Sequence, residues 1–153
     1  MKNPTIHSCS AETLDLPSFL PYRLSILEHR VSKAIAQHYV KSFNLSRMQW
    51  RALATLATYE RISARDICDI THLDKMQVSR AVNHLKQEGL VVQKQSKTDQ
   101  RTQELSLTKK GCHVYQQIIP LVKQEEQRIL SLLSENEQKQ LIGILDKLEQ
   151  SFA

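Results

Sequence analysis

DKMQVSRAVNHLKQEG, residues Asp74–Gly89, is the stretch that decides the fold. At 100° per residue its apolar side chains fall on one narrow stripe of a helix: Val78, Ala81, Val82 and Leu85. The opposite side carries a different set: Met76, Arg80, Asn83 and Gln87, flanked by Ser79 and His84. Arginine can pair with guanine, asparagine or glutamine with adenine, and an apolar side chain can lie on a thymine methyl group. This face therefore fits a DNA-reading helix, but an ordinary amphipathic surface helix is an equal alternative until the flanking sequence is considered.

Both ends of this helix carry sequence signals. Asp74 and Gln77 have the spacing of a capping box, in which each side chain accepts from the other's backbone N–H. Gly89 is placed to end the helix.

The composition favours a helical protein with a packed core. The chain has 153 residues, 41% of them hydrophobic, with only three glycines and four prolines, which is enough for one domain or two small ones sharing a core. No run approaches the roughly 18 apolar residues of a membrane span, and the N-terminus has no apolar signal region. We therefore expect a cytoplasmic protein, nucleoid-associated when bound to DNA, with no membrane partner.

Positive charge is concentrated near the central helix. The whole chain carries a formal net charge of +5, and residues 75–101 contain six Lys or Arg against two acidic residues. The cysteines, Cys9, Cys68 and Cys112, are odd in number and scattered, which indicates reduced thiols and not a disulfide framework.

The segment before the central helix predicts three further helices. The first runs from about Pro17, with Ser18 as its expected N-cap, to 42–44, and its length of some 25 residues suggests burial against another subunit. The second begins at a capping box, Ser46 with Gln49. The third has about eight residues and begins at a similar pair, Ser63 with Asp66. A short helix, a tight turn and a longer helix with a polar face form a helix-turn-helix.

After Gly89 the sequence pattern becomes typical of strands. Residues 90–94 and 102–107 are two short runs suited to strands, separated by a basic tip at 95–101, which predicts a β-hairpin wing. Thr108 caps the next helix, and Ser134 with Glu137 opens the last one. The fold class is therefore mostly α, an α+β winged helix-turn-helix core with N- and C-terminal helices that form a dimerisation module. The expected divisions are a tail (1–16), dimerisation helix 1 (17–44), the winged helix-turn-helix (45–107) and dimerisation helices 5 and 6 (108–153).

With these elements in place, the chain resembles the MarR family of bacterial transcription regulators from Leu20 to Leu148. Three blocks carry the resemblance: LPYRLSILEHRVSKAI leading to LSRMQWRALATL, then ISARDICDITHLDKMQVSRAVNHLKQEGLV, then the wing signature DQRTQELSLT. The last block fits the family pattern D-x-R-x3-aliphatic-x-L-T, except that Gln100 stands where a second basic residue is common.

The resemblance implies a homodimer that binds pseudo-palindromic double-stranded DNA, with one recognition helix in each major groove. Many members release DNA on binding a small phenolic or other anionic effector between the two modules. We therefore expect a DNA-binding transcription regulator, most simply a repressor, with no cofactor. A redox response through cysteine is one alternative. A helical protein-interaction module that does not bind DNA is another.

The residues expected to contact DNA lie on three elements. They are Ser63, Lys75, Met76, Gln77, Ser79, Arg80, Asn83, His84, Lys94, Lys97, Asp99 and Arg101. By resemblance, Arg101 enters the minor groove while Asp99 holds its guanidinium, although a plain surface ion pair is the alternative. For His84, a phosphate or solvent contact is as plausible as base reading.

The other candidate sites carry weaker signals. A ligand cleft between the two modules would be lined by Tyr22, His29, Trp50 and Arg51, although core packing is the better explanation for Trp50. Cys68 lies on an apolar helix face and is expected to be a buried structural thiol. The adjacent Cys112 and His113 point about 100° apart on a helix, which is poor geometry for a shared metal. No nucleophile elbow, glycine-rich phosphate loop or paired buried carboxylates indicate an enzyme.

Overall fold

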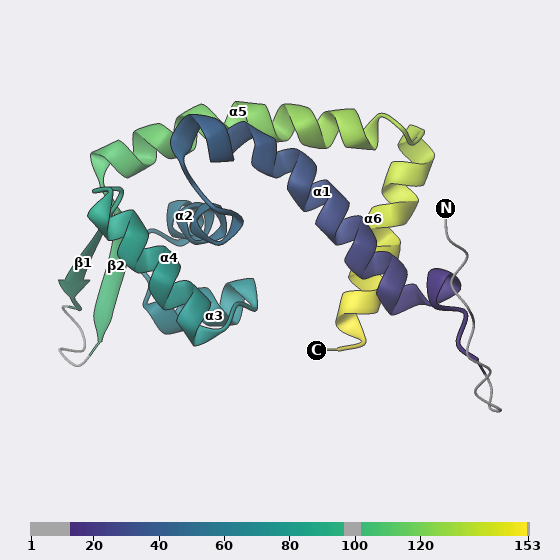
Figure 1. Ribbon diagram of the computed structural model, residues 1–153, viewed down its shortest axis with the longest axis horizontal. Coiled ribbons are helices and arrows are strands. Elements are labelled where there is room, and N and C mark those ends of the chain that lie inside the picture. The colour runs from purple at the N-terminus through teal and green to yellow at the C-terminus, as the bar shows by residue number, and fades with distance from the viewer. Residues whose placement is uncertain (1–12, 97–101, 153) are drawn as a thin grey trace, which may run out of the picture.

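The computed structural model describes residues 13–96 and 102–152 (Figure 1). The elements, in chain order, are the 3-10 helix η1 (Leu16–Ser18), α1 (Leu20–Phe43), α2 (Arg47–Tyr59), α3 (Ala64–Thr71), α4 (Lys75–Gln87), β1 (Val91–Gln95), β2 (Gln103–Leu107), α5 (Lys109–Leu130) and α6 (Glu135–Gln150). The expected order of helices and strands is confirmed, and the fold is a mostly helical winged helix with a two-stranded sheet. Among the helices of these two ranges, none combines the length and hydropathy needed to cross a bilayer.

The molecule is elongated along α5. Figure 1 shows the group α2, α3, α4 and the hairpin near one end of α5, and α6 hanging from the other end. Helix α1 runs obliquely from the winged-helix group toward the level of α6, so its N-terminal half lies away from that group.

The wing is an antiparallel pair whose register runs from Val91 opposite Leu107 to Gln95 opposite Gln103. Both strands begin one residue later than the sequence predicts. Ile62, between α2 and α3, exchanges backbone hydrogen bonds with Leu105, so a short third segment joins the sheet. This bridge fixes the wing to the start of α3.

The predicted capping boxes at Ser46, Ser63, Asp74 and Ser134 are all confirmed, each with both reciprocal hydrogen bonds. These pairs satisfy backbone N–H groups that the first turn of a helix leaves without partners. The expected cap at Ser18 is wrong. Ser18 belongs to the 3-10 turn, whose end displaces the start of α1, so the extended residue before α1 is Phe19.

Two glycines mark places where no other residue fits easily. Gly89 follows α4 with φ of +68°, a left-handed conformation that glycine adopts without steric cost. Gly111, in the first turn of α5, lies against the Leu90 carbonyl, and a Cβ built there would lie 2.1 Å from that oxygen. Close contact between α5 and the start of β1 therefore requires glycine at position 111.

Helix α2 ends in an unusual turn. Glu60 has φ of 54° and ψ of −60°, and the Arg61 N–H donates to the Tyr59 carbonyl at 2.6 Å. These angles are those of the strained form of γ-turn. The turn redirects the chain into the Ile62 bridge.

The core is continuous across the expected division at 44/45 and 107/108. Leu53, Leu56 and Leu85 are fully buried in the winged helix, and the same cluster includes Tyr39 from α1 and Ile118 from α5. In contrast, no residue of α6 is buried. The C-terminal half of α1 and the N-terminal half of α5 therefore fold with the winged helix.

Candidate nucleic-acid interface

Helix α4 presents its polar face to solvent because its apolar stripe is buried in the core. Val78, Ala81, Val82 and Leu85 are the buried residues, as the sequence predicts. The expected base-reading residues on the other side are exposed: Met76, Gln77, Ser79, Arg80 and Asn83. Met76 is 62% exposed, a position that suits contact with an apolar group on a partner.

The described residues that are expected at phosphates lie on α4, on β1 and at the start of α3. Lys75 is exposed in the first turn of α4, and Lys94 is exposed on β1 opposite Glu104. Ser63 is already engaged at the start of α3: its hydroxyl donates to the Asp66 carboxylate at 2.8 Å and accepts from the Asp66 N–H. The hydrogen bonds from Ser63 also lower the pKa of the Asp66 carboxyl below its ordinary value. Ser63 therefore caps α3, and its hydroxyl is hydrogen-bonded to Asp66.

His84 lies differently from the other expected base readers. Its Nδ1 atom is buried and has no hydrogen-bond partner among the residues that the structure describes. The ring borders a hollow of about 300 Å³ with Val40, Leu45 and Gln49, at the corner where α1 gives way to α2. His84 is thus half-buried beside that corner, unlike the exposed residues of α4.

The wing tip carries the remaining expected contacts. Lys97, Asp99 and Arg101 lie outside the described residues, so their expected roles rest on the sequence signature. The strands that lead to them are fixed by the register and by the Ile62 bridge.

The four residues expected in a ligand cleft are not brought together in one cavity among the described residues. Tyr22 and His29 are exposed on α1, and Tyr22 lines a hollow near the N-terminal end of that helix. Arg51 pairs with Glu28 at 3.2 Å. Trp50 is stacked between two tyrosines, with ring centroids 5.4 Å from Tyr39 and 5.9 Å from Tyr115. The aromatic stack therefore fills the junction of α1, α2 and α5.

Charged pairs hold α1 to its neighbours. The exposed Glu28 carboxylate accepts a hydrogen bond from Ser32, which together with Arg47 and Arg51 lowers its pKa below the ordinary value. On the other side, Glu125 of α5 lies 2.6 Å from Arg128 and 3.3 Å from His38 of α1. The pKa of Glu125 is lowered mainly by the hydrogen bond from Arg128. Both carboxylates are therefore held charged between α1 and the adjacent helix.

The thiols and acids form no metal site within the described ranges. No group of three or more His, Cys, Asp or Glu side chains there is arranged to hold a metal ion. Cys68 was expected to be buried, but it is half-buried and lines a cavity beside α4. Sequence periodicity could not reveal that cavity, because it is bounded by segments far apart in the chain.

Comparison with known proteins agrees with this geometry. Residues 43–102 match the sequence profile described as the MarR family. The HTH-type transcriptional regulator BilQ of Clostridium symbiosum is 31% identical over 86 residues, which cover 56% of this chain and 60% of BilQ.

Two solved structures illustrate the shared fold. The MepR–DNA complex of S. aureus has a TM-score of 0.78 at 21% identity, covering 87% of this chain and 98% of MepR. The PcaV transcriptional regulator of Streptomyces coelicolor, in complex with its natural ligand, has a TM-score of 0.78 at 18% identity, covering 94% of this chain and all of PcaV.

Proposed function

We propose that this chain is a DNA-binding transcription regulator of the MarR type and not an enzyme, and that it acts as a homodimeric repressor on a pseudo-palindromic operator. The observation that carries the proposal is the exposed face of α4, where Arg80, Gln77 and Asn83 accompany the exposed Met76. These side chains match the hydrogen-bonding and methyl groups of the major groove. A small organic anion releases the dimer from DNA.

The side chains divide by the part of DNA that they contact. Arg80 pairs with a guanine, and Gln77 is placed in the first half of α4, which enters the groove in such motifs. Lys75, Lys94 and Ser63 meet phosphates, which position the protein without specifying sequence. His84 supports α4 from the corner of α1 and α2 instead of reading bases.

The wing provides the second contact. In this proposal Arg101 enters the minor groove, Asp99 orients its guanidinium, and Lys97 adds affinity that depends on salt. The support for these roles is the complete wing signature in the sequence.

Dimerisation uses the apolar surface that the single chain leaves open. On α6, Ile142, Ile144 and Leu145 are 57%, 56% and 42% exposed. On the N-terminal half of α1, Leu20 and Leu27 are 55% and 58% exposed. Exposed apolar side chains gathered on two helices suit a protein interface, and a second copy of the chain covers them in our proposal.

Selection of bound sites from random duplex DNA tests the function. We expect half-sites related by a two-fold axis and about one helical turn apart. Arg80→Ala should weaken binding to the selected site about 5- to 150-fold, the equivalent of about 1–3 kcal/mol for a bidentate contact, whereas Arg23→Ala on α1 should not. Arg101→Ala should weaken it as well. Selected sites without two-fold symmetry would contradict the proposal. Unchanged binding by both Arg80→Ala and Arg101→Ala would contradict it as well.

The dimer needs its own measurement. Leu145→Glu should shift the protein toward monomer in sedimentation equilibrium, because it places a charge in the proposed interface. Asn136→Glu adds the same charge on the polar side of α6 and should leave the dimer intact. Equal behaviour of the two variants would argue against this surface.

A further inference from the structure

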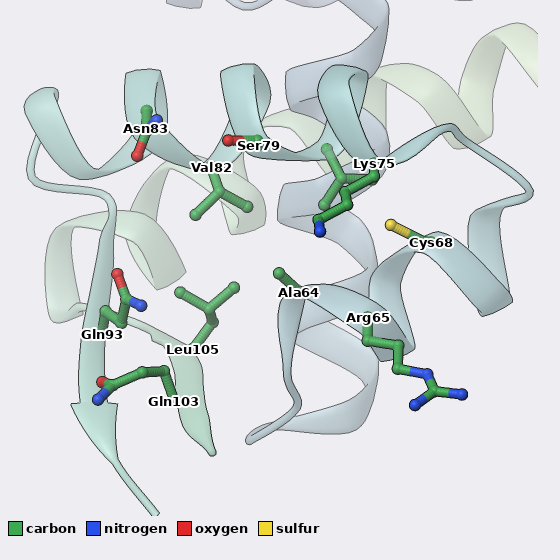
Figure 2. A pocket seen from close by; sticks show the side chains of 11 residues that line it. Ala64, Arg65, Cys68, Lys75, Ser79, Val82, Asn83, Gln93, Gln103 and Leu105 are labelled. Carbon is green, nitrogen blue, oxygen red and sulfur yellow. The ribbon is translucent and has the colours of Figure 1, made fainter. Parts of the chain in front are cut away.

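The outer part of the wing extends beyond the hydrophobic core. On β1, Val91 is buried and Val92 is half-buried, whereas the residues that follow, Gln93, Lys94 and Gln95, are exposed. We call the exposed end of the hairpin, from Gln93 onward, the outer wing. A cavity of about 500 Å³ lies between the strands, α3 and α4 at this level (Figure 2). Close packing therefore holds the base of the wing, whereas the cavity leaves the outer wing without such packing against α4.

A side-chain hydrogen bond joins α4 to the hairpin where the outer wing begins. The Lys86 ammonium group, in the last turn of α4, donates to the side-chain carbonyl of Gln93 at 2.5 Å. A charged donor makes such a bond stronger than one between two neutral groups. Figure 2 shows Gln93 on β1 and Asn83 on α4 at opposite walls of the cavity. Lys86 lies about one helical turn after Asn83, so its bond to Gln93 connects these two walls.

The turn between α4 and β1 is held in place from α5. The Lys110 ammonium donates to the Glu88 carbonyl at 2.7 Å, and the Thr108 hydroxyl donates to the Gly89 carbonyl at the same distance. Because both the turn and the base of the wing are fixed, a movement of the outer wing relative to α4 is a bend of the hairpin about its base. The hydrogen bond between Lys86 and Gln93 opposes that bend.

A lysine on a recognition helix would ordinarily be assigned to a DNA phosphate. Here the amino group of Lys86 is already bound to the wing. We propose that Lys86 and Gln93 are a pair of positioning residues, which hold the wing at the angle to α4 that lets both elements contact one DNA duplex together. The inference rests on the proposed function, because it concerns how the two DNA contacts of that proposal are kept in register.

A double-mutant cycle tests the pair on the duplex selected from random DNA. Lys86→Met and Gln93→Met keep the length of each side chain and remove the hydrogen bond. Each should raise the Kd by about 2- to 10-fold, the range for loss of one hydrogen bond. The double variant should bind no more weakly than the weaker single variant, because the same bond is lost in each. Unchanged binding by Gln93→Met, or effects that multiply in the double variant, would overturn the proposal.

The salt dependence of binding separates positioning from a phosphate contact. A lysine bound to a phosphate contributes about 0.9 to the slope of log Kd against log salt concentration. Gln93 has no charge, so a positioning pair should give Lys86→Met and Gln93→Met the same slope. A slope lower by about 0.9 in Lys86→Met than in Gln93→Met would place Lys86 on a phosphate and overturn the proposal.

The dependence on the wing contact is a readout that a merely structural role would not change. In an Arg101→Ala background the contact that the pair positions is absent, so adding Gln93→Met should have no further effect on the Kd. If Gln93→Met weakens the Arg101→Ala protein as much as it weakens the parent, the pair does not act through the wing. Unchanged binding by Arg101→Ala alone would instead refute the wing contact of the proposed function, so the two failures are distinguishable.

Two variants serve as matched controls. Gln103→Met replaces another glutamine that lines the same cavity, from β2, and Lys123→Met removes one exposed lysine from α5. Both should bind the selected duplex like the parent, and circular dichroism should show every variant to be folded. A loss of affinity in Gln103→Met equal to that in Gln93→Met would overturn the assignment to the hydrogen-bonded pair.

Discussion

Replacing Gly111 with alanine should destabilise the protein through one defined contact. The added methyl carbon would lie 2.1 Å from the Leu90 carbonyl oxygen and 3.0 Å from its carbon, about 1.3 Å inside ordinary van der Waals contact. These are backbone atoms and cannot rotate away. The same oxygen accepts from the Thr108 N–H at 3.0 Å, and the Thr108 hydroxyl donates to the Gly89 carbonyl at 2.7 Å. Helix α5 must therefore move as a unit away from β1.

The expected magnitude follows from three effects. Overpacking costs about 1–3 kcal/mol, and loss of a backbone hydrogen bond costs about 1 kcal/mol. Alanine gains about 1 kcal/mol over glycine inside a helix, which offsets part of this. We expect a net loss of about 1–3 kcal/mol in the free energy of unfolding.

Urea unfolding followed by circular dichroism measures this loss, at one fixed protein concentration because the proposed dimerisation would affect apparent stability. Gly143→Ala is the matched control. It adds the same methyl group to α6, where no atom lies within 4 Å, so stability should stay the same or rise by up to about 1 kcal/mol. If Gly111→Ala unfolds at the same urea concentration as Gly143→Ala, the close contact of α5 with Leu90 is not as described.

Three further predictions concern single side chains. Asp74→Ala should lower the free energy of unfolding by about 0.5–2 kcal/mol through loss of the α4 cap, measured by urea titration against the exposed Asp69→Ala. Tyr115→Leu should lower it by about 0.5–1.5 kcal/mol beyond lost burial and should change the emission of the single tryptophan, Trp50; an unchanged spectrum would contradict the stacking. The pKa of the Asp66 carboxyl is lower in the folded protein than in the unfolded chain. Its charged form therefore stabilises the folded state above the unfolded pKa of about 3.9, and this stabilisation is lost as the pH falls through the folded pKa. The stability difference between the parent and Asp66→Asn should therefore narrow from pH 6 toward pH 3, and a constant difference would refute this linkage.

The local signals in the sequence were sufficient to predict the helices and, except for α1, the residues at which they start. A capping box joins residues three apart, so Ser46 with Gln49 or Asp74 with Gln77 can be identified without knowing the rest of the fold. The apolar stripe of α4 also followed from spacing alone, and it correctly separated buried from exposed residues.

Features that depend on distant neighbours could not be predicted in this way. A helical wheel gives the angle of His84 around α4 but does not show that the α1–α2 corner occupies that side. The pairing of Ile62 with Leu105 joins segments more than 40 residues apart in the chain. The cavity that Cys68 lines beside α4 could not be predicted either, because residues of α3, α4 and the two strands together form its wall.

Because one core runs from Tyr39 through the winged helix to Ile118, a rotation of α5 moves the winged helix with it. Its 22 residues span about 33 Å, and its first half moves with α4 because both belong to one packed unit. A rotation of about 6° at the α6 end would displace the other end by about 3.4 Å, the rise of one base pair. In the proposed dimer, the angle at which the two copies meet would therefore set which spacing between half-sites they can read, although the contact between the copies would lie far from the DNA.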